Sequence, residues 1–471
     1  MLQAEKSLIS SDGILMTKSN FLFYFFSVIA ILFARVAFDV INQIEVHFDE
    51  AQYWVWSQNL SLSYLSKGPL VPSLIAFSNQ IFGQTYFGLK FFSFVAYLGT
   101  IITLSLTAFK ISNKKTSFYN ALILSALSPA IFILGGVAST DIFLFLFWSL
   151  TLLCYVCFFK DRDEKWFYVI GITTGLGILA KLTMVLLPLS ILLYFLTTDL
   201  RKYFLNIHIY LSAIIAVLIS SPILIWNAQN NWLTLFHEID HLVSETPTLN
   251  PEVLLFTLIL TVPSSLFLFS NKIRESVFCS KFDYLIYPTV LMIVFFIIKS
   301  FTGKIQLNWS IPIFLGLIPI FASALKAANG RAIVLSILFL GPIFLLSNNR
   351  ISSLIMNYDP LHPARGWNET YQNLFQNEDY DYLASEDYTL LSTAAYFQGD
   401  ARNLFLTKSS DRRLTHYDLW QIDLNPTDKI LFIDYSENEL PSVDLDCAKI
   451  REVKNFHRKQ LTLYNLSLIH I

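Results

Sequence analysis

The stretch from His47 to Phe82 holds the residues of this chain best suited to acid–base chemistry beside a lipid headgroup. Asp49 and Glu50 are adjacent, and a carboxylate at the edge of a bilayer can deprotonate a sugar hydroxyl or a lipid phosphate acceptor. Lys67 precedes Gly-Pro, and its ammonium group suits a phosphate ligand. Asp is also a favoured helix cap. We expect an active-site loop here with Asp49 and Glu50 as catalytic carboxylates, lined by the interfacial aromatic residues Tyr53, Trp54, Trp56 and Tyr64.

The composition is that of a polytopic membrane protein. Apolar residues make up 54% of 471, charged residues 14%, and the mean hydropathy is +0.52, whereas soluble domains are about 45–50% apolar and about 25% charged. The net charge of −2 argues against nucleic acid as a partner. Four cysteines form neither a disulfide framework nor a zinc-binding pattern.

Apolar stretches long enough to cross a bilayer recur along the first 347 residues. With hidden short spans allowed for, they predict about 11–13 transmembrane helices. Residues 1–20 are polar and the first span is long, which indicates an uncleaved signal anchor. The expected spans lie near 21–41, 86–109, 117–134, 141–159, 166–181, 183–197, 203–226, 252–270, 284–298, 310–324 and 332–347.

Lysine and arginine indicate the sidedness, because they stay cytoplasmic. With the N-terminus inside, 15 of the 21 basic residues before position 348 fall in inner segments, which places loop 42–85 and the C-terminus outside. Basic residues near the outer face are costly and often functional. They suggest an anionic ligand such as a lipid phosphate, although snorkelling or pairing with acids is the alternative. These residues are Lys67, Lys181, Lys299 and Lys304.

Two domains follow from this pattern. Residues 1–347 form a transmembrane catalytic domain, with an amphipathic interfacial helix from Asp49 to about Leu60. Residues 348–471 are more polar and form a small α/β domain outside the membrane. In it we expect a helix at YTLLSTAAYFQ and strands at 428–435 and 460–464.

Short motifs along nearly the whole chain occur in an order and spacing that resemble those of bacterial family-39 glycosyltransferases. These are relatives of protein mannosyltransferases and include lipid A aminoarabinose transferases. The motifs are DEAQYWVWS at 49–57, YLSKGPL at 64–70, Thr140-Asp141, GLGILAK at 175–181, SPILIWN at 221–227 with NW at 231–232, KSFTGKIQLNW at 299–309, DP at 359–360, RGW at 365–367 and HYDLW at 416–420.

The resemblance implies a GT-C fold in the bacterial inner membrane, with the C-terminal domain in the periplasm. Such enzymes move a sugar, with inversion, from a polyprenyl phosphate to an acceptor. Here the donor would carry undecaprenyl phosphate, and the acceptor would be lipid A or another envelope glycolipid. Asp49 matches the base, Asp141 the second acidic position, and Lys67 the lysine that holds the donor phosphate. His241 and Trp309 are expected, with Tyr53 and Tyr64, to line the substrate site.

One departure from the family pattern and three alternative functions stay open. Ser66 stands where the aminoarabinose transferases have a glutamate implicated in a metal site. We therefore assign no metal ligand, leave a divalent cation open, and do not assign the sugar. The alternatives are a protein O-mannosyltransferase-like enzyme, a lipid transporter or flippase, and a membrane metalloprotease that uses the HExxH pattern at 237–241.

Overall fold

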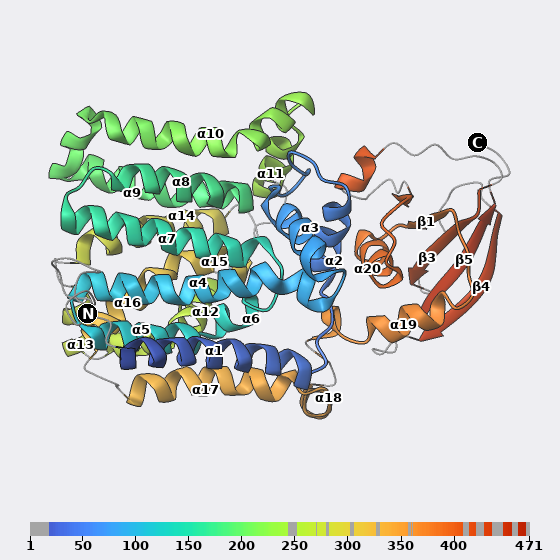
Figure 1. The fold of residues 1–471 in the computed structure, drawn as a ribbon, viewed down its shortest axis with the longest axis horizontal. Helices are drawn as coiled ribbons and strands as arrows, with labels where there is room; N and C mark the ends of the chain where they lie inside the picture. Colours follow the sequence, from blue (N-terminus) through green and yellow to red (C-terminus); the bar gives the residue numbers. More distant parts are fainter. Residues whose placement is uncertain are drawn as a thin grey trace, which may run out of the picture.

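The computed structural model describes residues 18–243, 252–269, 271–278, 282–301, 306–325, 330–356, 359, 361–407, 414–420, 428–435, 446–454 and 460–467. A bundle of apolar helices lies beside a smaller part that contains a sheet, and α2 and α3 lie where the two meet (Figure 1). An all-α membrane bundle with a small C-terminal α/β part is the predicted architecture, and the structure confirms it.

Every predicted span contains helix. Five helices in the described part of the chain are long and apolar enough to cross a membrane, or up to seven if each bent pair is one span. The chain is therefore a multi-pass membrane protein. The helices of the bundle are α1 (Lys18–Ile41), α4 (Tyr86–Ser112), α5 (Lys115–Ala126), α6 (Pro129–Leu134), α7 (Thr140–Asp161), α8 (Trp166–Ala180), η2 (Leu182–Val185), α9 (Leu186–Thr197), η3 (Asp199–Leu205), α10 (Ile207–Gln229), α12 (Glu252–Thr261), η4 (Pro263–Phe269), α13 (Asn271–Val277), α14 (Asp283–Ser300), α15 (Leu307–Leu315), α16 (Leu317–Ala324) and α17 (Gly330–Ser347).

Some predicted spans are broken. The span at 117–134 is α5 followed by α6, because Ser128 caps a new helix that has Pro129 at its first position. The span at 310–324 is α15 and α16, which bend by 45° at Gly316. Because of such breaks, fewer single helices have the length needed to cross a membrane than the hydropathy of the sequence predicts.

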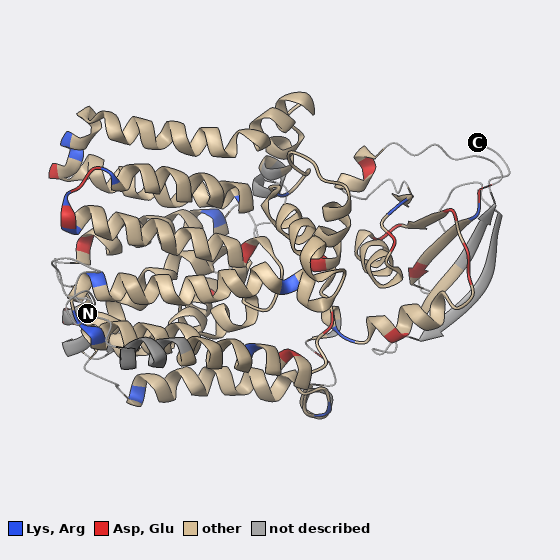
Figure 2. Cartoon of the chain, in the orientation of Figure 1, with Lys and Arg blue, Asp and Glu red and all other residues tan. Residues whose placement is uncertain are grey.

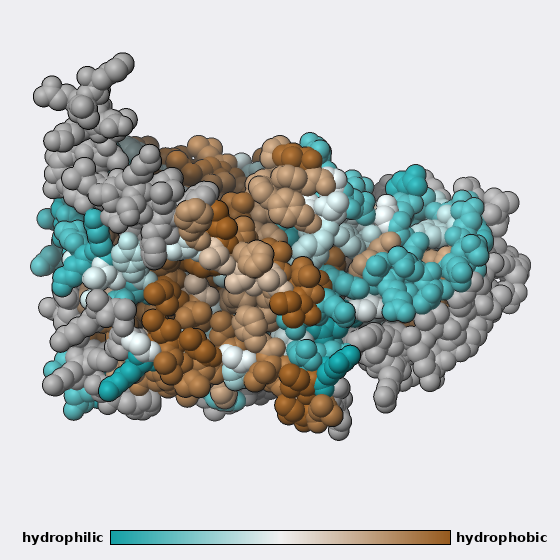
Figure 3. Space-filling view, turned by 60° about the horizontal axis from the view of Figure 1, so that its bottom comes forward, coloured by the Kyte–Doolittle hydropathy of each residue, from teal (hydrophilic) through white to brown (hydrophobic). Residues whose placement is uncertain are grey.

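The outer surface of the bundle suits lipid. Large apolar side chains are exposed along α10 and α17, among them Leu218, Ile225 and Leu338. In the space-filling view apolar residues form a broad area over the bundle, whereas the coloured residues of the C-terminal part are mostly hydrophilic (Figure 3). Charged residues lie mainly toward the two ends of the bundle (Figure 2).

Small residues allow α8 to lie close to α10. A Cβ atom at Gly171 would be 2.5 Å from the carbonyl oxygen of Ser212, and one at Gly175 would be 2.7 Å from Cβ of Ile219. Glycines four residues apart are a common solution for tight helix packing in membranes. The GLGILAK motif therefore has a packing role along α8, before it reaches Lys181.

The C-terminal part is built on a five-stranded sheet in the order β2-β1-β3-β5-β4. β1 pairs in parallel with β2 and β3, whereas β5 pairs antiparallel with β3 and β4. The predicted helix and both predicted strands are present as α20, β3 and β5. The elements are η6 (His362–Ala364), α19 (Trp367–Leu374), β1 (Tyr382–Ser385), α20 (Tyr388–Gln398), β2 (Leu404–Leu406), η7 (His416–Leu419), β3 (Ile430–Tyr435), β4 (Asp446–Lys454) and β5 (Gln460–Ser467).

Polar contacts hold the two parts together at the end of α1. The Arg365 guanidinium donates to the carbonyl oxygens of Asn42 and Ser347 at 2.6–2.9 Å, and pairs with Asp359 at 2.7 Å. The Glu45 carboxylate accepts from the backbone N–H of Trp367 at 2.8 Å, at the start of α19. The predicted boundary after residue 347 falls between α17 and α18 (Asn349–Met356).

The two helices of the first outer loop are α2 (Phe48–Gln58) and α3 (Leu70–Phe82). The first of them was predicted to be an amphipathic helix at the membrane surface, and the structure shows it packed within the protein. Eight of its residues are buried, since it packs on α3 and on α20 of the C-terminal part. Its aromatic side chains are therefore an interface between domains, as the edge-to-face contact of Trp54 with Tyr396 illustrates.

Candidate active site

Asp49 lies in the first turn of α2, which begins after a different capping residue from the one predicted. His47 is the N-cap: its Nδ1 accepts from the Asp49 N–H at 3.2 Å, and the Glu50 carboxylate accepts from the His47 N–H at 2.9 Å. The Asp49 side chain is 43% exposed and lies 3.8 Å from His47 Nδ1. Because capping uses other groups, the Asp49 carboxylate is available for chemistry at a helix N-terminus that favours its negative charge.

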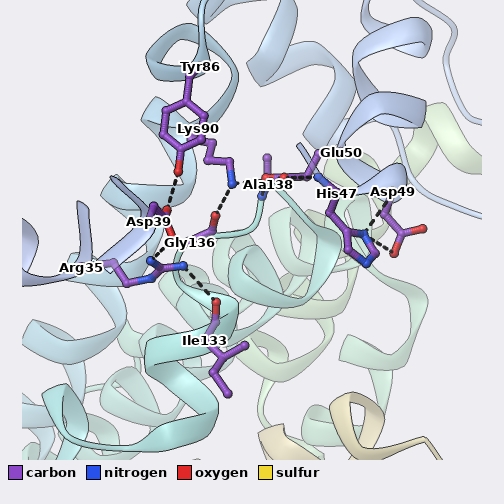
Figure 4. A network of polar contacts seen from close by, with 10 residues as sticks. All are labelled: Arg35, Asp39, His47, Asp49, Glu50, Tyr86, Lys90, Ile133, Gly136 and Ala138. Atoms are coloured by element: carbon purple, nitrogen blue, oxygen red, sulfur yellow. Dashed lines mark hydrogen bonds and ion pairs between the residues drawn. The ribbon is translucent and has the colours of Figure 1, made fainter. Parts of the chain in front are cut away.

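Glu50, the other carboxylate predicted to be catalytic, lies within a buried polar network. Its side chain is fully buried and pairs with Lys90 Nζ at 3.1 Å. Its other oxygen accepts from the Ala138 N–H at 2.6 Å. Figure 4 shows the carboxylate enclosed between α2, α4 and the segment before α7. Glu50 therefore connects the start of α2, which carries Asp49, with the segment that leads to Asp141.

The same polar network continues into α1. Lys90 donates to the carbonyl oxygen of Gly136 at 2.8 Å and lies over the ring of Tyr86. The Tyr86 hydroxyl donates to Asp39, which pairs with Arg35 (Figure 4). Buried ions are retained where partners compensate them, so this network fixes α1, α4 and the segment before α7 relative to one another.

Asp141, the second predicted acid, is held by two side chains from other helices. Its carboxylate lies 2.7 Å from Lys181 Nζ and accepts from the Asn308 amide at 3.0 Å. All three residues lie at one end of their helices, α7, α8 and α15. For Lys181 the alternative of pairing with an acid therefore applies. Asp141 is already engaged by a cation and an amide, which suits an orienting role better than that of a base.

Lys299 joins this group through an aromatic ring. Its Nζ lies 4.0 Å from the ring centroid of Trp309, in cation–π geometry. Trp309 follows Asn308, which binds Asp141. Trp309 was itself predicted to line the site, so the structure links four of the predicted residues, Asp141, Lys181, Lys299 and Trp309.

The turn with Lys67 is packed directly on the end of α8. A Cβ atom at Gly68 would lie 2.0 Å from the carbonyl oxygen of Leu179, so only glycine allows this approach. Leu179 is two residues before Lys181. Lys67 and Lys181 are therefore neighbours in the fold, on segments far apart in the sequence.

Tyr53 and Tyr64 were both predicted to line the substrate site, and both are buried. Burial, followed by the charges of Asp49 and Asp141, raises the pKa of Tyr53, and a hydrogen bond with the side chain of Thr140, the residue before Asp141, opposes this rise. Tyr64 stacks on Trp56 with ring centroids 4.5 Å apart, and its hydroxyl donates to the Trp56 carbonyl oxygen at 3.0 Å. Tyr53 thus belongs to the site, whereas Tyr64 stabilises the first outer loop through its contacts with Trp56.

The remaining residues singled out in the sequence lie in or next to segments that the structure does not describe. Lys304 and the side chains of His241 and Glu238 lie outside the described residues. The HExxH pattern falls on α11 (Leu233–Val243). Among the described residues, no three His, Cys, Asp or Glu side chains form a group that could hold a metal ion.

Three comparisons relate the chain to known proteins. Residues 66–226 match the family model for dolichyl-phosphate-mannose-protein mannosyltransferases. A lipid A galacturonosyltransferase, RgtD, of Rhizobium johnstonii is 25% identical over 193 residues, which are 41% of this chain and 40% of that protein. The alignment thus spans two fifths of the length of this relative.

The fold is that of a solved GT-C protein. ArnT from Cupriavidus metallidurans in the apo state has a TM-score of 0.68 at 12% identity, over 93% of this chain and 97% of that chain. The structure of the same protein bound to undecaprenyl phosphate has a TM-score of 0.65 at 11% identity, over 95% and 98% of the two chains. The expected GT-C fold is confirmed, and it extends over nearly the whole molecule.

Proposed function

We propose that this protein, which resembles the mannosyltransferase family over residues 66–226 and ArnT over its whole fold, is a membrane glycosyltransferase. It moves a sugar, with inversion, from undecaprenyl phosphate to lipid A. One observation carries the proposal: the available carboxylate of Asp49 belongs to α2, and Tyr53 of the same helix hydrogen-bonds the side chain of Thr140, the residue before the Asp141–Lys181 pair. The solved relative that binds undecaprenyl phosphate supports the donor, and the galacturonosyltransferase supports the acceptor.

Asp49 is the general base of the proposed reaction. No lysine or arginine of the described chain pairs with its carboxylate, and its neighbour is the imidazole of His47. It accepts the proton of the acceptor hydroxyl while the oxygen attacks C1 of the sugar, and the bond from C1 to the lipid phosphate breaks. General-base catalysis contributes about 100- to 10,000-fold to a rate.

The lysines bind the departing phosphate. Lys181 donates one of its three N–H bonds to Asp141, so two remain for phosphate oxygens. Lys67 is held against the same end of α8 through Gly68, and Lys299 approaches from α14. Positive charge placed where negative charge develops stabilises the transition state. Asp141 and Asn308 keep the Lys181 ammonium in place.

This function implies the inner membrane of a bacterium, with the site and the C-terminal domain on the periplasmic side. The charge distribution of the sequence supports this orientation. The description of the family model supports a second candidate, in which the acceptor is a protein.

Mass spectrometry of lipid A from cells with and without the gene tests the proposal. We expect lipid A one sugar heavier only when the wild-type gene is present, and the mass difference identifies the sugar. Unchanged lipid A together with newly glycosylated membrane proteins would favour the second candidate. Unchanged lipid A, glycolipids and proteins would contradict the proposed function.

A further inference from the structure

His416, in the C-terminal part, directly contacts the loop that carries Lys67. Its Nδ1 accepts a hydrogen bond from the backbone N–H of Leu65 at 3.3 Å, in a buried contact between residues 351 positions apart. Only 6% of His416 is exposed. A buried bond of this kind fixes the relative position of two segments, because each polar group loses its alternative partner in water.

The bonded N–H belongs to a turn that is closed by Lys67 itself. The carbonyl oxygen of Lys67 accepts from the Tyr64 N–H at 3.1 Å and from the Ser63 hydroxyl at 3.4 Å. Leu65 lies inside this turn. The C-terminal domain therefore fixes the Leu65 amide, whereas Gly68 fixes the other end of the turn against α8.

Aromatic rings surround the imidazole and restrict its orientation. The ring of Tyr64 is edge-on at 4.8 Å and that of Trp56 at 5.7 Å, both from the first outer loop. Trp226, at the end of α10, lies 6.0 Å away, and Trp420 of the C-terminal part 5.9 Å away. The imidazole thus stands where the bundle, the loop and the C-terminal domain meet.

The segment that carries His416 is itself rigidly attached. Thr415 and Asp418 form a capping box around η7, and the neighbouring Tyr417 hydroxyl lies 2.6 Å from that of Ser392 in α20. Burial lowers the pKa of His416 to about 4. The ring is therefore neutral at physiological pH, and the hydrogen bond from the Leu65 N–H assigns its single proton to Nε2, so that Nδ1 accepts.

We propose that His416 is a positioning residue for Lys67, through which the C-terminal domain sets the affinity for the phosphate of the lipid donor. The inference rests on the proposed function, since it concerns the same donor site. It also gives a role to the HYDLW motif at 416–420, which lies far in sequence from every other residue of the site.

Variants of His416 test this role with purified protein in lipid nanodiscs, an undecaprenyl phosphate-linked sugar and lipid A. His416→Phe keeps a ring but removes the acceptor, and His416→Gln moves the acceptor to another position. Loss of one buried hydrogen bond predicts a rise in the donor KM of about tenfold, with the acceptor KM unchanged. His416→Asn keeps an acceptor close to the position of Nδ1, so its donor KM should stay within about threefold of the wild-type value.

Arg402→Met is the control, because it alters the same C-terminal part at a surface pair with Asp400 and leaves the rings around His416 intact. We expect its donor KM to equal that of the wild type. Binding of undecaprenyl phosphate alone to each variant gives a second readout that needs no turnover. Equal donor KM values for wild type, His416→Phe and His416→Gln would overturn the inference, as would an equal rise in donor and acceptor KM. If the wild type transfers no sugar but the variants still differ from it in their binding of undecaprenyl phosphate, the proposed reaction is contradicted and the role of His416 is not.

Discussion

Removal of the Lys90 ammonium tests whether Glu50 is a positioning residue rather than a catalytic one. In Lys90→Met the side chain keeps much of its volume, but the fully buried Glu50 carboxylate loses the cation 3.1 Å away. Breaking a buried pair costs about 3–5 kcal/mol. The His47 and Ala138 N–H groups still bind the carboxylate, so we expect the lower end, about 3 kcal/mol.

The double variant Lys90→Met/Glu50→Gln separates charge from shape. A neutral glutamine can still accept from Ala138 but not from His47 at the same time, so the expected cost is one hydrogen bond, about 1 kcal/mol. Activity should follow the same order. Glu50 anchors both the start of α2 and the segment before Asp141, and a displacement of about 1 Å at reacting groups can cost about 100-fold in rate.

Denaturant unfolding in detergent micelles and sugar-transfer rates are the measurements. Lys110→Met is the matched control, because Lys110 pairs with Asp161 at 2.8 Å in a partly exposed contact at the other end of the bundle. Its loss should cost less than about 1 kcal/mol and leave transfer unchanged. If Lys90→Met is as stable and active as the wild type, or if the double variant is less stable than the single one, the assignment of Glu50 is refuted.

Three further predictions concern the other parts of the site. Asp141→Asn leaves the buried Lys181 ammonium without its carboxylate, and should reduce transfer about 100-fold or more, measured with saturating donor and acceptor. Gly68→Ala forces a Cβ atom toward the Leu179 carbonyl oxygen, 2.0 Å away before any shift, and should raise the donor KM while the far end of the bundle keeps its stability. Burial lowers the pKa of His416 from 6.5 to about 4, so only the unfolded chain takes up this proton as the pH falls below 6.5. The stability contributed above pH 6.5 is thus lost toward pH 4, by about 3 kcal/mol, and unfolding of His416→Phe at both pH values should lack this component.

Hydropathy and charge predict most of the fold, because a lipid environment requires long apolar helices and places basic residues on one side. The pair at Lys110 and Asp161 shows that residues expected on one side do lie together. Broken spans such as α5–α6 are harder to foresee, since a local cap at Ser128 overrides a continuous apolar run.

The site was predicted in part. Lys67, Lys181 and Lys299 stand out as cations near the outer face, and the structure gathers them at one end of the bundle. Adjacent carboxylates could not be distinguished in the sequence, because their roles depend on Lys90 of another helix. Lys90 itself was visible only as a charge inside an apolar span.

Two other residues stood in motifs noted in the sequence but were assigned no role. Asn308 gave a weak signal within KSFTGKIQLNW, but its bond to Asp141 joins residues 167 positions apart. His416 lies 351 positions from Leu65. Such contacts depend on how segments distant in the sequence pack together. Neither the periodicity nor the local spacing of residues in a single sequence predicts them.

Transfer by purified protein from an undecaprenyl phosphate-linked sugar to lipid A, with and without Asp49→Asn, measures the central claim most directly. Asn keeps the size of the side chain but cannot take a proton, so kcat should fall about 100-fold or more, while the donor KM and the binding of undecaprenyl phosphate stay unchanged. Transfer at the wild-type rate by Asp49→Asn would contradict the account.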